Sequence, residues 1–251
     1  MEQYDGIIVI LMAIAILSVT VFGLIDSIKN FDKRKEEYKR YIENKKTLPK
    51  ETPNYYNLYK GIVAEFEVYK IIHRKLFGEY RFFNSVYLPK NEKEVTETDF
   101  IIIHENGIFV LEIKNIYGNI YGEIESDNWI QRIEEQNKIV NMYNPIKQNK
   151  NHIKYLKQNI NMDNYNLSDE NIYSIIVFGD NSNIESVKLN ESNLKVINVN
   201  ELEDTLNDII NNNLNILDRS QIDEISSVIE EYSEVDESVK VNHINTITEY
   251  S

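Results

Sequence analysis

The chain has 251 residues, enough for one sizeable domain with appendages, and it contains no cysteine. Disulfides, thiolate metal sites and a cysteine nucleophile are therefore excluded. The formal net charge of −14 is concentrated in residues 161–251, which carry 19 acidic side chains against 4 lysines and arginines. The first 160 residues are close to neutral and compatible with nucleic acid, whereas the acidic C-terminal part suits a basic protein partner.

An uncharged apolar run, GIIVILMAIAILSVTVFGLI, occupies residues 6–25. As a helix, this run is long enough to span a hydrocarbon core of about 30 Å. A cleaved signal peptide, the competing interpretation, requires basic residues before the run and a small-residue cleavage site after it. Here Glu2 and Asp5 precede the run and the basic residues follow it. The positive-inside rule predicts a single-pass anchor in the cell membrane, with the N-terminus outside and the C-terminal domain in the cytoplasm.

Composition divides the chain into four segments. We expect residues 1–26 to form the transmembrane anchor, 27–56 a charged juxtamembrane stalk, 57–231 a globular domain, and 232–251 an acidic flexible tail.

The globular domain is expected to begin with a helix. Residues 59–77 place apolar side chains three and four positions apart, which predicts an amphipathic helix with Glu65 beside its apolar stripe. A carboxylate at such a position is commonly a solvated flank residue, but it can reach a site if the helix packs beneath a sheet. Residues 80–88 predict a strand that ends at Pro89, and residues 90–98 a polar loop.

Residues 99–115, DFIIIHENGIFVLEIKN, predict an antiparallel hairpin with two apolar runs joined across Asn106-Gly107. Asn-Gly is the dipeptide most typical of a two-residue type I′ turn. With that turn, Ile108 pairs with Glu105, and Asp99 faces Lys114 at the open end of the hairpin.

Three polar side chains share one face of this predicted hairpin, namely Asp99, Glu112 and Lys114. Two carboxylates suit a hard divalent cation, and a nearby ammonium can orient a water and offset developing charge, as hydrolysis of a phosphodiester requires. The alternative is that Glu112 and Lys114 mark the point where a buried strand emerges into solvent.

Strands and helices follow the hairpin. Residues 136–159 are expected to be largely helical with an interruption at Asn144-Pro145, and 199–211 to be a helix capped by Asn200 with Glu203 three residues later. The further elements are strands at 117–122 and 194–199, a strand or loop at 123–131, a fully buried strand at 171–178, and a helix at 216–231. This order predicts an α/β (α+β) fold with a mixed central sheet flanked by helices.

Several short motifs follow one another in a specific order along the domain. They are Gly61-x-x-Ala64-Glu65, Thr96-Glu97-Thr98-Asp99, Gly107-Ile108-Phe109-Val110-x-Glu112-x-Lys114-Asn115, Tyr117-Gly118-x-Ile120-x-Gly122, Trp129, and Asn144-Pro145-x-x-Gln148-Asn149-x-x-His152-x-x-x-Leu156. In this order, over residues 59–156, they resemble the nuclease-related domain (NERD), a family similar to the restriction-endonuclease-like PD-(D/E)XK enzymes. The resemblance favours the catalytic interpretation of the hairpin.

The resemblance implies a role for each of five side chains. Asp99 and Glu112 resemble the metal-binding acids, and Lys114 resembles the catalytic lysine that positions the attacking water. Glu65 resembles the helical acid that completes the metal site, and Gln148 a polar residue near the substrate phosphate. The implied cofactor is Mg²⁺ or Mn²⁺.

The chain departs from the family pattern around the first acid. Thr98 and Phe100 stand where isoleucine and histidine are usual, and Ala64 stands where glycine is common. His104 and His152 are candidates to replace the missing imidazole, although an isolated histidine is more often structural.

The implied function is that of a membrane-anchored nuclease that holds nucleic acid, with DNA as the expected substrate, through its backbone phosphates. The alternative is a catalytically silent, membrane-tethered scaffold that binds nucleic acid or protein. A transport or signalling role is disfavoured, because the sequence has one apolar span, no charge inside it and no glycine-rich phosphate loop.

Overall fold

A computed structural model describes residues 55–189, 191–236 and 238–240. The predicted anchor, most of the predicted stalk and the end of the predicted tail lie outside these residues. The chain divides after Glu51, and all the described residues belong to the unit Thr52–Ser251. No helix among the described residues is both long enough and apolar enough to cross a membrane.

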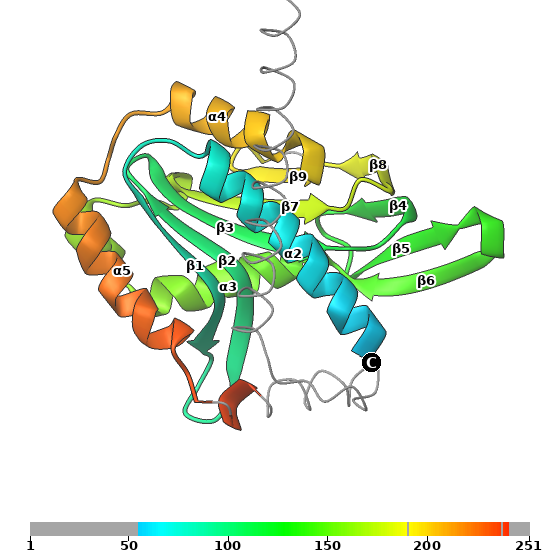
Figure 1. Ribbon diagram of the computed structural model, residues 1–251, viewed down its shortest axis with the longest axis horizontal. Coiled ribbons are helices and arrows are strands. Elements are labelled where there is room, and N and C mark those ends of the chain that lie inside the picture. The colour runs from blue at the N-terminus through cyan, green and yellow to red at the C-terminus, as the bar shows by residue number, and fades with distance from the viewer. Residues whose placement is uncertain (1–54, 190, 237, 241–251) are drawn as a thin grey trace, which may run out of the picture. The chain divides into compact units, whose positions relative to one another are not determined.

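The strands of the described residues form two mixed sheets (Figure 1). The five-stranded sheet has the order β1-β2-β3-β7-β9, with β1 at Tyr80–Pro89, β2 at Val95–His104, β3 at Gly107–Lys114, β7 at Ile172–Phe178 and β9 at Leu194–Asn198. The four-stranded sheet has the order β6-β5-β4-β8, with β4 at Gly118–Glu123, β5 at Asn128–Ile133, β6 at Lys138–Tyr143 and β8 at Ser182–Lys188. The helices are α2 (Tyr55–Lys75), α3 (Pro145–Asn159), α4 (Leu202–Asn212) and α5 (Arg219–Ser233), with short 3-10 helices η1 (Glu134–Gln136), η2 (Met162–Tyr165), η3 (Asp169–Asn171) and η4 (Val199–Glu201).

The five-stranded sheet combines an antiparallel and a parallel half. Strands β1, β2 and β3 pair antiparallel, whereas β3, β7 and β9 pair parallel. Every residue of β7 is buried. The continuous apolar run from which β7 was predicted is therefore explained by its position inside the sheet, where both faces are covered.

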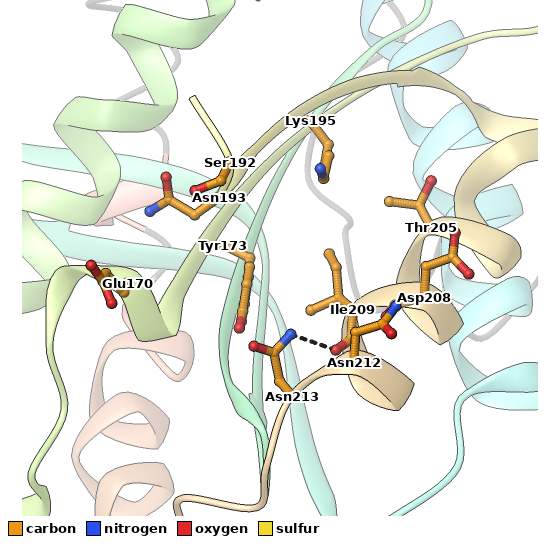
Figure 2. Close-up of a pocket in the computed structure, with 10 residues that line it drawn as sticks. All are labelled: Glu170, Tyr173, Ser192, Asn193, Lys195, Thr205, Asp208, Ile209, Asn212 and Asn213. Carbon is orange, nitrogen blue, oxygen red and sulfur yellow. Dashed lines mark hydrogen bonds between the residues drawn. The ribbon is translucent and has the colours of Figure 1, made fainter. Parts of the chain in front are cut away.

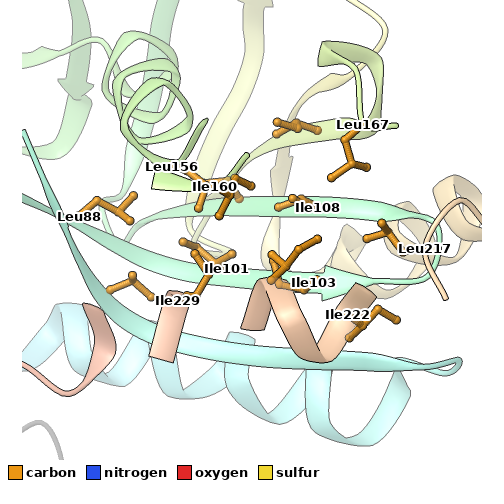
Figure 3. Packing of buried hydrophobic residues seen from close by; sticks show 14 residues of the cluster. Leu88, Ile101, Ile103, Ile108, Leu156, Ile160, Leu167, Leu217, Ile222 and Ile229 are labelled. Atoms are coloured by element: carbon orange, nitrogen blue, oxygen red, sulfur yellow. The ribbon is translucent and has the colours of Figure 1, made fainter. Parts of the chain in front are cut away.

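Helices α2 and α3 pack on opposite faces of this sheet. On one face, the Tyr69 ring of α2 lies 5.7 Å from the Phe82 ring, and Phe82 stacks on Phe100. Ile101 follows Phe100 and points to the other face, where it packs in a cluster with Leu156 of α3 and with α5 (Figure 3). Ile108 and Val110 of β3 belong to this cluster, which stabilises the strand because each fully buried aliphatic side chain contributes about 1.5–3 kcal/mol.

The predicted mixed sheet flanked by helices is confirmed by the five-stranded sheet, but the second sheet, with its strand β8, was not predicted. Two segments were assigned to the wrong kind of structure. Residues 138–143 were predicted to be helical and instead form β6, which pairs antiparallel with β5. Residues 95–98 were predicted to be a loop and belong to β2. The physical reasons differ, because polar side chains hide the alternation at the start of β2, whereas β6 carries apolar residues on its exposed face.

The predicted hairpin forms, but its register differs by two residues. The loop residues are Glu105 and Asn106, and His104 pairs with Gly107. Gly107 has a φ of +139°, and an ideal Cβ there would lie 2.4 Å from the carbonyl oxygen of Asn171. Glycine is therefore required at the start of β3, after the turn. Because the shift is an even number of residues, every side chain keeps its predicted face.

Two helix starts show how the sequence caps this fold. Helix α3 begins after the N-cap Asn144, with Pro145 in its first turn as predicted. The capping box before α4 joins Asn198 and Glu201, so the predicted pair, Asn200 and Glu203, is wrong by two positions.

Candidate active site at the carboxyl end of β3

Glu112 and Lys114 form a close ion pair where β3 ends. The Nζ of Lys114 lies 2.6 Å from Oε1 of Glu112. The Glu112 side chain is 3% exposed and the Lys114 side chain 24% exposed, so water has little access to the acid and more to the amine. An ion pair of this kind sits at the boundary between the core and the solvent.

Asp99 of β2 lies beside this pair. Its Oδ2 accepts a hydrogen bond of 2.7 Å from the backbone N–H of Ile113. The negative charge of Asp99 also contributes to the raised pKa of Lys114. The paired residues of β2 and β3 end at Phe100 and Leu111. Beyond this pair, the Asp99 carboxylate accepts the backbone N–H of Ile113 in place of a ladder hydrogen bond. The hairpin thus brings two carboxylates and one ammonium together.

Helix α3 supplies two further polar groups from consecutive turns. The Oε1 of Gln148 accepts a hydrogen bond of 2.9 Å from Nζ of Lys114. The Nε2 of His152 lies 3.2 Å from Oε2 of Glu112, and its Nδ1 lies 3.0 Å from Oγ1 of Thr96. If Nε2 carries the proton, His152 donates to Glu112 and accepts from the hydroxyl of Thr96. Gln148 therefore holds the Lys114 ammonium, and His152 holds the Glu112 carboxylate.

The charges of the site stabilise one another. Burial by itself raises the pKa of Glu112, but the Lys114 ammonium and the hydrogen bond from His152 outweigh burial and lower it. Burial by itself lowers the pKa of Lys114, and the two carboxylates outweigh it and raise this pKa. Both groups are held in their charged forms.

The donor set fits a hard divalent cation in part. Mg²⁺ is commonly held by one or two carboxylates, with substrate phosphate and water filling the remaining positions. Asp99 and Glu112 supply such a pair, and each oxygen of Glu112 keeps one lone pair beside its present hydrogen bond. In the part of the chain that the structure describes, however, no group of three or more histidine, aspartate and glutamate side chains is arranged to hold a metal ion.

Glu65, the predicted third metal ligand, is half-buried on α2. This helix packs on the face of the sheet opposite to α3. The helix that carries Glu65 thus packs on the other face of the sheet from Gln148 and His152, and the place of Glu65 among the metal ligands stays a prediction.

The two histidines proposed as replacements have different surroundings. His104 is buried at the far end of β2, where Nε2 lies 2.8 Å from the carbonyl of Phe77 and Nδ1 accepts the N–H of Asn106. These contacts hold the hairpin turn, so His104 is structural. His152 is the one in contact with Glu112.

Sequence reasoning missed Thr96 as a site residue and named His152 only as a candidate to replace the missing imidazole. The signal for His152 was the spacing of four from Gln148, which puts both side chains on one face of α3. Thr96 belongs to the motif Thr96-Glu97-Thr98-Asp99, but no spacing linked it to α3, because its segment was predicted to be a loop.

If Asp99 and Glu112 hold a metal ion, His152→Leu is expected to lower its affinity and any activity that depends on it about 10- to 100-fold, because His152 contacts Glu112. His104→Leu is the matched control, because it also removes a buried histidine with two hydrogen bonds, at the other end of β2. Activity and Mn²⁺ affinity are compared at equal amounts of folded protein. Equal losses in both variants would make His152 merely structural.

Two pockets help to place this site. Figure 2 shows a pocket of about 620 Å³ whose lining includes Tyr173, Lys195 and Asp208. Tyr173 is near the amino end of β7, whereas Lys114 at the other end of the parallel strand β3 pairs with Phe178, so this pocket is remote from the ion pair. A different pocket, of about 600 Å³, begins directly after Lys114 and is described below.

Residues 60–179 match the model of the NERD family, the nuclease-related domain. The matched range contains every predicted site residue and runs from α2 to the residue after β7. The comparison with curated proteins finds no match.

Proposed function

Residues 60–179 form a nuclease-related domain, and from this premise we propose that the chain is a metal-dependent nuclease that hydrolyses phosphodiester bonds, with DNA as its substrate. The observation that carries the proposal is the ion pair of Glu112 and Lys114 beside Asp99, with Gln148 on the amine and His152 on the acid.

Each of these side chains has a task in the proposed reaction. Asp99 and Glu112 would hold Mg²⁺ or Mn²⁺, which when bound polarises the phosphoryl oxygen and offsets the charge that develops on it. Lys114 orients the attacking water, and Gln148 keeps the ammonium in place. The water oxygen forms a bond to phosphorus and releases a proton to the solvent, the bond from phosphorus to the leaving sugar oxygen breaks, and that oxygen takes up a proton from the solvent. His152 holds the acid in position throughout.

The proposal extends to the place of the reaction. The apolar run at residues 6–25 would anchor the chain in the cell membrane and keep the nuclease domain on the cytoplasmic side. The acidic C-terminal part would repel nucleic acid and is therefore assigned to a protein partner.

A catalytically silent scaffold is the second candidate function. The observation that favours it is the engagement of both Glu112 oxygens, one by Lys114 and one by His152. A silent protein would keep this pair as a structural element and neither bind Mn²⁺ nor cleave.

Cleavage of plasmid and single-stranded DNA by the full-length chain tests the proposal, in Mg²⁺, in Mn²⁺ and in EDTA. We expect cleavage only with a divalent cation, and its loss in Glu112→Gln. The matched control is Glu191→Gln, which removes a carboxylate paired at 2.7 Å with Lys150 on the surface of α3. Equal cleavage by the wild type and Glu112→Gln would contradict the assignment.

A further inference from the structure

The outer face of the second sheet exposes four large apolar side chains. Tyr121 of β4 is 38% exposed, Ile130 of β5 41%, and Ile139 and Tyr143 of β6 60% and 50%. Tyr121 lies directly opposite Ile130 in the ladder. These residues alternate with inward ones that fill the core, so the sheet has one packed face and one exposed face.

The polar positions of this outer face are unusual for such an acidic chain. The outward residues of β4, β5 and β6 besides the four apolar ones are Asn119, Glu123, Asn128, Arg132 and Asn141. Glu123 is the only carboxylate in this set from the described strands, and it pairs with Lys188 at 3.2 Å. Two carboxylates border this set, because Glu134 lies 3.9 Å from the Arg132 guanidinium and the exposed Glu185 of β8 precedes Ser186, the ladder partner of Tyr121.

Arg132 and Tyr121 form a pair at the centre of the face. The guanidinium of Arg132 lies 5.9 Å from the centre of the Tyr121 ring. Asn119 stands opposite Arg132 in the ladder and adds an amide beside the charge. A ring, a guanidinium and an amide are therefore presented together to solvent.

A pocket adjoins this face and is lined by the residues that follow β3. Its volume is about 600 Å³, and its lining begins with Asn115, the residue after Lys114, and includes Asn119 and Arg132. Asn119 and Arg132 are therefore shared by the pocket and the exposed face. Glu134 and Glu135 line the same pocket.

We propose that the outer face of the second sheet binds single-stranded nucleic acid that continues from the catalytic site. Bases stack on Tyr121 and Tyr143, and Arg132 binds a backbone phosphate. A duplex keeps its bases stacked on one another and cannot use such a platform. This proposal rests on the proposed nuclease function and names its substrate as single-stranded at this point.

Fluorescence anisotropy of the full-length chain in EDTA tests the proposal, with a labelled oligothymidylate and a labelled duplex of mixed sequence as probes. Tyr121→Leu keeps an apolar side chain but removes the ring, and we expect it to weaken binding of the single strand about 5- to 100-fold and to leave duplex binding unchanged. Tyr121→Phe keeps the ring and is expected to bind as the wild type does. Phe77→Leu, which removes an aromatic ring that is 49% exposed outside this sheet, is the matched control.

The outcomes separate this proposal from the function on which it rests. Unchanged single-strand binding by Tyr121→Leu, with cleavage still lost in Glu112→Gln, would overturn the platform and keep the nuclease. A wild type that neither binds nor cleaves nucleic acid would overturn both. Concentration-dependent dimers that Tyr121→Leu abolishes, with no effect on binding of the single strand, would make the face an interface between copies of the chain.

Discussion

Lys114→Met is expected to lower the cleavage rate about 100- to 10,000-fold, the range that a positioned group acting on the attacking water typically contributes. The same variant should retain Mn²⁺ binding. Removal of the Lys114 ammonium frees the Glu112 oxygen that now lies 2.6 Å from it. Cleavage rate and Mn²⁺ affinity are measured on the same preparation. Loss of turnover with retained metal binding distinguishes a catalytic lysine from a merely structural one.

The control for this prediction is Lys150→Met. Lys150 is also a lysine in an ion pair, with Glu191 at 2.7 Å, but it lies on the outer side of α3. We expect it to cleave as the wild type does. Wild-type cleavage by Lys114→Met would remove this lysine from the mechanism.

Lys114→Met should also lower the free energy of unfolding, because it leaves the buried Glu112 carboxylate without its partner, which costs about 3–5 kcal/mol. The double variant Lys114→Met, Glu112→Gln should recover part of this loss, since it leaves no uncompensated charge. Activity is therefore compared at equal amounts of folded protein.

Asn144→Ala is expected to lower the free energy of unfolding by about 1.5–5 kcal/mol. Its Oδ1 caps α3 by accepting from the N–H groups of Ile146 and Lys147, and loss of such a cap costs about 0.5–2 kcal/mol. Its Nδ2 donates to the carbonyl oxygens of Glu123, Ile124 and Ser126. Leaving buried acceptors of this kind unpaired costs about 1–3 kcal/mol more. Urea denaturation measures the change.

Two further variants divide this effect into its parts. Asn144→Asp keeps the cap and loses the Nδ2 donor. Its decrease in the free energy of unfolding therefore measures the hydrogen bonds between Asn144 and the turn before β5. Asn141→Ala is the control, because Asn141 is an exposed asparagine of β6 and should stay within about 0.5 kcal/mol of the wild type. Equal stability of the wild type and Asn144→Ala would show that this residue does not stabilise the contact between α3 and the turn before β5.

The face of each hairpin side chain could be predicted from the sequence, although the register could not. The Asn-Gly signal placed the turn one residue too late, because Gly107 is required by the nearby carbonyl of Asn171 and not by the turn. A shift of two residues preserves the alternation of faces. Asp99, Glu112 and Lys114 could therefore be grouped without knowledge of the true pairing.

The second sheet was harder to predict because its strands are short and one face is exposed. In β6, Ile139 and Tyr143 point outward, so apolar residues mark the solvent side and mislead a prediction based on burial. Long-range contacts account for other failures. Thr96 and His152 meet only through tertiary packing, and no local pattern reports that the imidazole would be 3.2 Å from Glu112.

Mn²⁺ binding by calorimetry, in the wild type, Asp99→Asn and Glu112→Gln, tests the central claim most directly. Asparagine at 99 still offers an oxygen to the N–H of Ile113, so the fold is kept while the charge is removed. We predict one site in the wild type that each substitution weakens about 10-fold or more. Equal binding in all three proteins would place any metal elsewhere, and the two acids of the hairpin would then have no share in it.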